Sequence, residues 1–339
     1  MQSASAGHNF RTPARHLSTT VNPFSYHRAR SAADAVERLS AGAAMPLGGG
    51  TDLVPLLQEE LAAPELVVDL RDAEGLGVLA LGDDGSARVG ATVRIHALAT
   101  DRRLRERYPV LAEACAAVGT TALRHMGTLG GNLCQRPRCW YFRRKIPCLK
   151  NGGDACPAID GENQYHAILG GGPCYIVHPS DPAVALTALD AVVEVRGPVG
   201  VRRVAIDDFF VLPSERLDHE TVLARGEIVT AVEIPPGRDG GVQRYYKLMQ
   251  RGSWDFALAS LAAVRRRDGA VRLVLGGVAP KPWRVDASVE EDVASGRLDP
   301  EDAAVLAERA LYDAAPLAKN AYKVELAAAL LRRGIRELL

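Results

Sequence analysis

Long apolar runs are missing from this 339-residue sequence, and so is an excess of charge of either sign. No stretch approaches the roughly 18 consecutive apolar residues that cross a bilayer as a helix, so we expect no membrane span. Lysine plus arginine and aspartate plus glutamate both number 41, which gives a formal net charge of zero. A nucleic-acid-binding protein normally has a basic excess or a basic face, so we expect no nucleic-acid partner.

Cysteine is scarce as well. Six cysteines in 339 residues are too few for a disulfide scaffold. Cys115 lies on a predicted apolar helix and is expected to be a buried small hydrophobic residue. The other five crowd into one stretch, and clustering of this kind indicates metal or redox chemistry. They are Cys134, Cys139, Cys148, Cys156 and Cys174.

The length of the chain predicts more than one folded unit. A single hydrophobic core usually stops growing below this size, so we expect two or three units. Residues 1–22 are rich in Ser and Arg and contain no acidic residue, and we expect them to form a disordered extension. A change to Pro- and Gly-rich composition at 236–241 marks a probable domain boundary.

Hydrophobic periodicity predicts the elements on either side of this boundary. Helices and strands alternate over residues 32–70, which is typical of an α/β unit. Asp84-Gly85 predicts the turn of a hairpin, and residues 96–118 have a helical pattern that is interrupted near Pro109. Beyond the boundary we expect an α+β unit. Its expected parts are two antiparallel strands joined at Asp268-Gly269 and two helices within 285–339.

Two glycine loops indicate a bound diphosphate. PLGGGTDL (46–53) joins a predicted strand to a predicted helix, and RHMGTLGGN (124–132) follows later. Glycine lets the backbone approach a ligand closely, and a helix N-terminus attracts an anion. The alternatives are an ordinary turn capped by Thr51 or Asp52, and a tight loop in which Thr and Asn bond to the local backbone. The first loop has neither Rossmann nor P-loop spacing.

Four blocks, in order, resemble the FAD-binding subunits of the xanthine dehydrogenase and aldehyde oxidoreductase group. They are PLGGGTDL, RHMGTLGGNLC, HPSDPAVALTALDA and YYKLMQRGSWDFALASLAA. The resemblance covers about residues 23–339 and implies an α+β fold. Its parts are a vanillyl-alcohol-oxidase-type FAD-binding domain (23–236) in two subdomains (about 23–75 and 76–236), and a smaller α+β C-terminal domain (241–339).

The resemblance also implies the residues that hold FAD. The ribityl or ribose hydroxyls would bond to Asp181, for which the alternative is a helix cap. The flavin ring would lie near Lys247, for which the alternative is a solvated lysine at a strand end, and near the Ile228-Val229 backbone. The diphosphate and ribityl region would contact Thr128, Gly131 and Asn132. The diphosphate would be wrapped by Leu47, Gly48, Gly49, Gly50, Thr51, Asp52 and Leu53.

A segment dense in Gly, Pro, Cys and Arg occupies residues 127–175, and a structureless stretch of this length is unusual unless it is functional. Residues 133–177, which overlap most of this segment, form an insert that the animal-type flavoprotein domains of the family lack. The insert resembles an extra loop in the flavin subunits of 4-hydroxybenzoyl-CoA reductase and of a bacterial aldehyde oxidoreductase. The resemblance implies a [4Fe–4S] cluster, which needs four thiolates. We expect the ligands to be Cys139, Cys148, Cys156 and Cys174.

Several alternatives remain at this stage. Cys134 belongs to the glycine-loop block, so it is left out of the ligand set, although five cysteines compete for four places. A structural zinc site is one alternative, but its ligands usually come as short C-x2–4-C pairs, which this segment lacks. Disulfides are another, but they need an oxidising compartment, for which the sequence offers no targeting evidence. The basic residues around Cys139 form either a solvated face or a charge that offsets the cluster. They are Arg136, Arg138, Arg143, Arg144 and Lys145.

The function implied by the resemblance is electron transfer. A molybdenum–pterin large subunit would oxidise the substrate, most simply an aldehyde, and a small [2Fe–2S] subunit would relay electrons to FAD on this chain. No residue of this chain need act as a general acid or base. The complex would be cytoplasmic, or periplasmic if it is exported on a partner's signal. The runner-up is a 4-hydroxybenzoyl-CoA reductase-type subunit; a self-standing FAD oxidase and a zinc-stabilised assembly protein are further alternatives.

Overall fold

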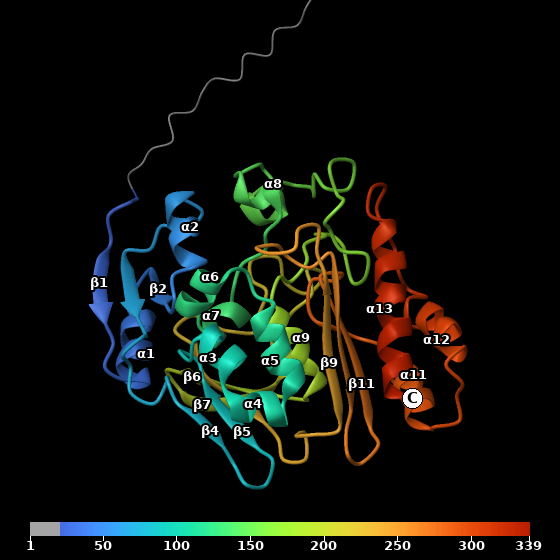
Figure 1. The fold of residues 1–339 in the computed structure, drawn as a ribbon. Coiled ribbons are helices and arrows are strands. Elements are labelled where there is room, and N and C mark those ends of the chain that lie inside the picture. Colours follow the sequence, from blue (N-terminus) through green and yellow to red (C-terminus); the bar gives the residue numbers. More distant parts are fainter. Residues whose placement is uncertain (1–20) are drawn as a thin grey trace, which may run out of the picture.

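The computed structural model describes residues 21–339, so residues 1–20 of the expected extension lie outside the described part of the chain. Three β-sheets follow one another along the sequence, each with its own helices (Figure 1). The blue N-terminal unit and the red C-terminal helices lie on opposite sides of the central unit. Within residues 21–339, no helix is both long enough and apolar enough to span a bilayer.

The N-terminal unit is a parallel sheet with helices between its strands, as the alternating pattern predicts. The Ser31 side chain accepts a hydrogen bond from the Asp34 backbone and so caps α1. The buried face of α1 consists of Ala35, Val36 and Leu39, at helical spacing. The sheet order is β1-β3-β2. The elements are β1 (Ser25–Arg28), α1 (Ala32–Ser40), β2 (Ala44–Leu47), α2 (Leu53–Gln58) and β3 (Leu66–Asp69).

The central unit contains a five-stranded antiparallel sheet in the order β4-β5-β8-β6-β7. The hairpin expected at Asp84-Gly85 is confirmed, and Gly85 has a φ of 78°, a left-handed conformation that favours glycine. Strands far apart in sequence are therefore neighbours in this sheet. The strands are β4 (Leu79–Leu81), β5 (Ala87–Gly90), β6 (Val192–Gly197), β7 (Gly200–Ala205) and β8 (Ile228–Ile234).

Helices pack against this sheet to form the largest apolar core of the described residues, which includes Cys115 with no exposed surface. The helical stretch breaks at Pro109, as expected, and also at Asp101, whose side chain accepts from the Leu104 backbone and starts a new helix. The helices are α3 (Ile95–Thr100), α4 (Arg102–Arg107), α5 (Pro109–Ala116), α6 (Thr121–Met126), α7 (Leu129–Leu133), α8 (Trp140–Arg143), α9 (Asp181–Ala188) and α10 (Ile206–Phe209).

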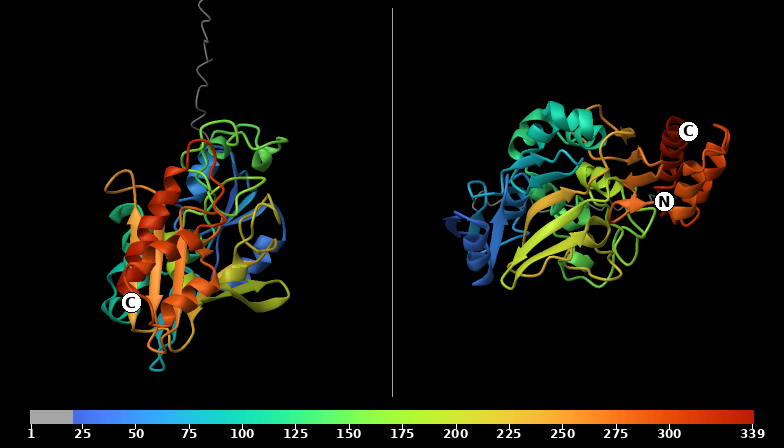
Figure 2. Two further views of the ribbon diagram at one scale, coloured as in Figure 1. Left: turned by 90° about the vertical axis from the view of Figure 1, so that its right-hand side faces the viewer. Right: turned by 90° about the horizontal axis from the view of Figure 1, so that it is seen from below.

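The C-terminal unit is a four-stranded sheet covered on one face by helices (Figure 2, left). The expected hairpin between β10 and β11 is confirmed. The expectation of two helices after residue 285 is wrong, because Gly296, with a φ of 66°, ends one helix early and three helices form. The elements are β9 (Val242–Leu248), β10 (Ala259–Arg265), β11 (Val271–Gly276), β12 (Trp283–Arg284), α11 (Ala287–Ala294), α12 (Asp302–Ala310) and α13 (Tyr322–Leu338).

The first turn of α13 holds the cysteine-rich insert against the C-terminal unit. Lys323 is fully buried and donates from Nζ to the carbonyl oxygens of Tyr165 (3.2 Å), His166 (3.0 Å) and Gly277 (2.6 Å). Asn320 donates to the His166 carbonyl as well, at 3.1 Å. The Lys323 amino group therefore joins three backbone acceptors from two parts of the chain.

We expect Lys323→Met to lower the free energy of unfolding by about 1–3 kcal/mol, because buried carbonyl groups lose their donor. The matched control is Lys319→Met, which removes the exposed ion pair with Glu162 and should cost less than about 1 kcal/mol. Urea unfolding of the two variants and the parent chain measures both effects. Equal stability of the Lys323→Met variant and the parent chain would contradict this role.

Candidate functional site

The two glycine loops contact each other. A Cβ atom added to Gly49 would lie 1.9 Å from the carbonyl oxygen of Met126, and one added to Gly48 would lie 2.6 Å from the hydroxyl of Thr128. No side chain fits at these distances, so the glycines allow the two loops to pack together. Gly50 has a φ of 75°, which also favours glycine. Loop–loop packing is thus a reason for glycine here that the sequence patterns did not suggest.

The second glycine loop is connected to the SDP block around residue 180. Thr128 caps α7 by accepting from the Gly131 backbone at 3.2 Å, the local role expected of a loop threonine. Asn132 instead reaches far along the chain, because its Oδ1 atom accepts from the Ser180 hydroxyl at 2.5 Å. The same Ser180 oxygen accepts from the Ala183 backbone and caps α9.

His178 strengthens this connection. Burial lowers the pKa of His178 to about 4, so the ring is neutral at pH 7. Its Nδ1 atom accepts from the Ser180 backbone at 3.4 Å, which leaves Nε2 to donate to the carbonyl oxygen of Leu133 at 3.2 Å. Sequence reasoning missed His178 and Ser180, although both belong to the HPSD motif.

Asp52 links the first glycine loop to the cysteine-rich insert. Its side chain makes no cap hydrogen bond, so the alternative in which Asp52 caps this turn is wrong. The carboxylate accepts instead from the Arg136 backbone (2.8 Å) and from the guanidinium groups of Arg138 (2.9 Å) and Arg143 (2.8 Å). Arg136 pairs through its own side chain with the buried Glu220. These three arginines therefore form no solvated face, because each is tied into an ion pair.

Asp181 and Lys247 are buried together between the central and C-terminal units. Asp181 Oδ2 accepts from Lys247 Nζ at 2.8 Å, and Oδ1 accepts from the Tyr245 hydroxyl at 2.7 Å. Lys247 also donates to the carbonyl oxygen of Ala117. Burial raises the pKa of Asp181, and Lys247 opposes this change. The alternative that Asp181 is a helix cap is wrong, because Ser180 caps α9. The alternative that Lys247 is a solvated lysine is also wrong, because its side chain is only 4% exposed.

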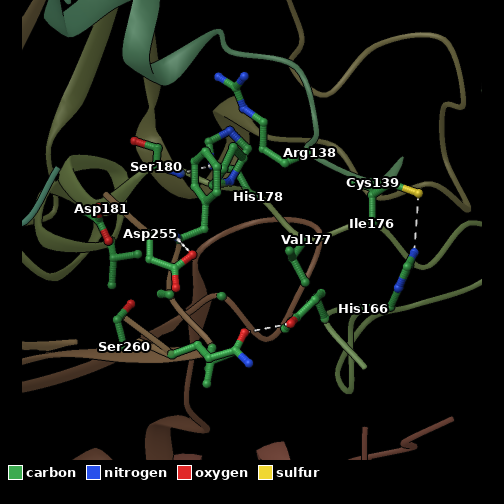
Figure 3. Close-up of a pocket in the computed structure, with 18 of the residues that line it drawn as sticks. Arg138, Cys139, His166, Ile176, Val177, His178, Ser180, Asp181, Asp255 and Ser260 are labelled. Carbon is green, nitrogen blue, oxygen red and sulfur yellow. Dashed lines mark hydrogen bonds between the residues drawn. The ribbon is translucent and has the colours of Figure 1, made fainter. Parts of the chain in front are cut away.

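A cavity of about 340 Å³ lies beside this ion pair. Figure 3 shows its walls, which come from the insert (Arg138, Cys139, His166, Ile176), the SDP block (His178, Ser180, Asp181) and the C-terminal unit (Asp255, Ser260). The Ser260 hydroxyl is buried and lines the cavity beside Tyr245, with which it interacts.

The structure does not bring every expected FAD residue to this cavity. Asp181 lines it, and Lys247 lies directly behind Asp181. The glycine loops do not line the cavity, but each bonds to a residue that does. Asp52 of the first loop pairs with Arg138, and Asn132 of the second loop bonds to Ser180. Ile228 and Val229 are buried in β8, where they pair with β6, and their side chains enter two different apolar cores.

Four cysteines of the insert lie near one another. The Cys174 thiol hydrogen-bonds to Cys156 and thereby lowers the pKa of Cys156 to about 6. Burial raises the pKa of Cys139 to about 11, and the nearby Cys156 and Cys148 contribute to the rise. Cys139 and Cys148 also pack into one small apolar cluster. Among residues 21–339, no group of three or more His, Cys, Asp or Glu side chains is arranged to hold a metal ion.

Cys134 lies apart from this group. It packs against the core of the central unit, and burial raises its pKa to about 12 with no contribution from another thiol. One histidine that sequence reasoning missed joins the four insert cysteines, because His166 Nε2 lies 3.3 Å from Cys139 Sγ.

Comparison with known proteins identifies the family. Residues 22–237 match the FAD binding domain in molybdopterin dehydrogenase, and residues 244–338 match the CO dehydrogenase flavoprotein C-terminal domain. The chain belongs to the FAD-binding subunits of molybdenum-containing oxidoreductases. The resemblance and the α+β fold expected from the sequence are confirmed, and FAD is the cofactor of the family's domain.

The relatives match nearly the whole chain. The aldehyde oxidoreductase FAD-binding subunit PaoB of Escherichia coli is 38% identical over 91% of this chain and 95% of its own length. The glyceraldehyde dehydrogenase medium chain of Sulfolobus acidocaldarius is 28% identical over 81% of this chain and 83% of its own. The solved structure of quinoline 2-oxidoreductase from Pseudomonas putida 86 has a TM-score of 0.70 and 25% identity, and the match covers 94% of this chain and 97% of that chain.

We expect Asp181→Ala and Lys247→Met each to destabilise the chain by about 3–5 kcal/mol, because each leaves one buried charge unpaired. The double variant should lose less than the sum of the two single losses, since it removes both charges. Urea unfolding of the parent and the three variants gives the coupling energy. Strict additivity would show that the two side chains do not depend on each other.

Proposed function

We propose that this chain is the FAD-binding electron-transfer subunit of a heterotrimeric molybdenum hydroxylase. Its partners are a molybdenum–pterin large subunit, which oxidises the substrate, and a small subunit whose [2Fe–2S] centres deliver electrons to FAD. An external acceptor then takes the electrons. The observation that carries this proposal is the packing of the two glycine loops against each other. The second loop is hydrogen-bonded through Asn132 to Ser180, which lines a cavity between the two family domains.

The described residues fit FAD. The diphosphate is held by the first loop, from Leu47 to Leu53, and by Thr128, Gly131 and Asn132, because backbone N–H groups at helix N-termini attract anions. Asp181 bonds to a ribityl or ribose hydroxyl. Each of its oxygens already accepts one hydrogen bond, and a carboxylate has about four acceptor positions. The flavin ring lies near Lys247 and the Ile228-Val229 backbone.

Bound FAD supplies the conversion between single electrons and electron pairs. This chain contributes position and electrostatics. Arg138 lines the cavity with a guanidinium group whose pKa is lowered, mainly by burial, although Asp52 opposes the change. The Ser260 hydroxyl lines the cavity on the C-terminal unit. No described residue needs to act on the organic substrate, which binds in the molybdenum subunit.

The insert carries a second cofactor in this proposal, a [4Fe–4S] cluster on Cys139, Cys148, Cys156 and Cys174. Four thiols of the described insert lie near one another, and thiolates are the usual ligands of iron–sulfur clusters. The hydrogen bond that lowers the pKa of Cys156 raises the pKa of Cys174, so both thiols would release their protons on binding a metal.

The substrate of the complex is an aldehyde. This part of the proposal is supported by the names of two relatives, an aldehyde oxidoreductase subunit and a glyceraldehyde dehydrogenase chain. The complex acts in the cytoplasm, or in the periplasm if a partner's signal exports it.

We expect Gly49→Ala to lose most bound FAD, because the new Cβ atom would force the first loop away from the Met126 carbonyl and open the diphosphate site. The control is Gly42→Ala, whose Cβ atom would meet nothing closer than 3.9 Å. The ratio of flavin to protein absorbance in the purified, folded proteins measures retention. Full FAD content in a folded Gly49→Ala protein would overturn the assignment of this loop.

We expect single Ser substitutions at Cys139, Cys148, Cys156 and Cys174 each to remove the cluster, because four thiolates are required. Cys134→Ser should keep four irons per chain, since this thiol lies apart from the others. Iron and sulfide analysis of the five anaerobically purified variants, with EPR of the reduced proteins, distinguishes the ligand sets. Zinc in place of iron in the parent protein would contradict the redox role of the insert.

A further inference from the structure

His166 occupies the wall between the four insert thiols and the cavity. Its side chain lines the cavity together with Cys139, and its Nε2 atom is 3.3 Å from Cys139 Sγ (Figure 3). It is only 4% exposed. Its other ring nitrogen, Nδ1, is also buried.

The direction of the hydrogen bond follows from the acceptor. A cysteine that binds iron is a thiolate, which has no proton to donate and accepts only. The ring nitrogen that faces it, Nε2, must therefore carry a proton. His166 thus presents an N–H group to the sulfur of a proposed cluster ligand.

Packing fixes the position of this ring. Trp140 meets it edge-on, with ring centroids 5.9 Å apart and an interplanar angle of 70°. The His166 backbone N–H donates to the Asn163 carbonyl at 3.0 Å, and its carbonyl oxygen accepts from Lys323 and Asn320 of the C-terminal unit. The C-terminal unit therefore orients a donor toward a thiol of the insert.

We infer that His166 is a positioning residue that donates a hydrogen bond to the Cys139 thiolate and raises the reduction potential of the cluster. Reduction adds one electron to the cluster, and a hydrogen bond to a ligating sulfur stabilises this more negative state, so the potential rises. His166 also lines the cavity beside Asp181, so the donor lies between the proposed cluster and that cavity. The inference rests on the proposed [4Fe–4S] cluster and deepens that proposal.

The test compares three variants in the full assembled complex. His166→Phe keeps an aromatic ring without a donor, and His166→Gln keeps an N–H donor on a side chain of similar reach. His178→Phe is the control, because His178 is equally buried on the same cavity wall but donates to the Leu133 carbonyl rather than to a thiol. Iron and sulfide content is measured first, followed by an EPR-monitored redox titration of the cluster.

We expect His166→Phe to retain iron and to shift the redox equilibrium toward the oxidised cluster by about tenfold, which is a fall of about 59 mV for a one-electron couple. His166→Gln should restore a midpoint close to that of the parent, and His178→Phe should leave the midpoint unchanged. If the phenylalanine ring prevents cluster insertion, His166→Leu takes its place.

The outcomes separate this inference from the proposed function. A parent complex whose FAD subunit holds no iron would defeat the proposed cluster itself. Four irons with the same midpoint in the parent, His166→Phe and His166→Gln would overturn the hydrogen-bond inference alone. Loss of iron from both His166→Phe and His166→Leu, with iron kept in His178→Phe, would make His166 a ligand or a packing residue and would also overturn it.

Discussion

The buried carboxylate of Asp181 constrains the arrangement of the whole molecule. An ionised carboxylate removed from water costs several kcal/mol unless it is paired and hydrogen-bonded, and its partners here, Lys247 and Tyr245, both lie on β9 of the C-terminal unit. The two units must therefore dock in one position for the charge to be compensated. That docking creates the cavity, since one wall belongs to the segment that carries Asp181 and another to the C-terminal unit.

The cysteine-rich insert has little regular structure, and charged groups hold it from two sides. Asp52, at the end of the first glycine loop, accepts from Arg138 and Arg143 of the insert, while Lys323 binds its later carbonyl groups from the C-terminal unit. These contacts add to the burial of apolar insert residues such as Phe142 and Ile168, and together they offset the conformational entropy of ordering the loop. The same contacts place thiols and the cavity next to each other, because Cys139 and His166 belong to both.

Much of the fold could be predicted where local patterns agree with tertiary packing. The buried face of α1, the Asp84-Gly85 hairpin and the β10–β11 hairpin follow from periodicity and turn residues. β9 was not predicted, because its most buried positions include Gln243, which bonds to the backbone instead of forming an apolar stripe. The break between α11 and α12 was missed because a single glycine in a polar segment ends the helix.

The sequence by itself determined the family, the FAD cofactor and the alternation of elements, because these depend on short motifs and on residue spacing that need no knowledge of distant contacts. It also singled out Asp52, Asp181 and Lys247 as notable residues. Only the tertiary structure decided what their side chains bind, since the partner of each lies 64 or more residues away along the chain. A charged side chain reveals its role only when burial forces it to find a partner, and burial is a property of the folded chain.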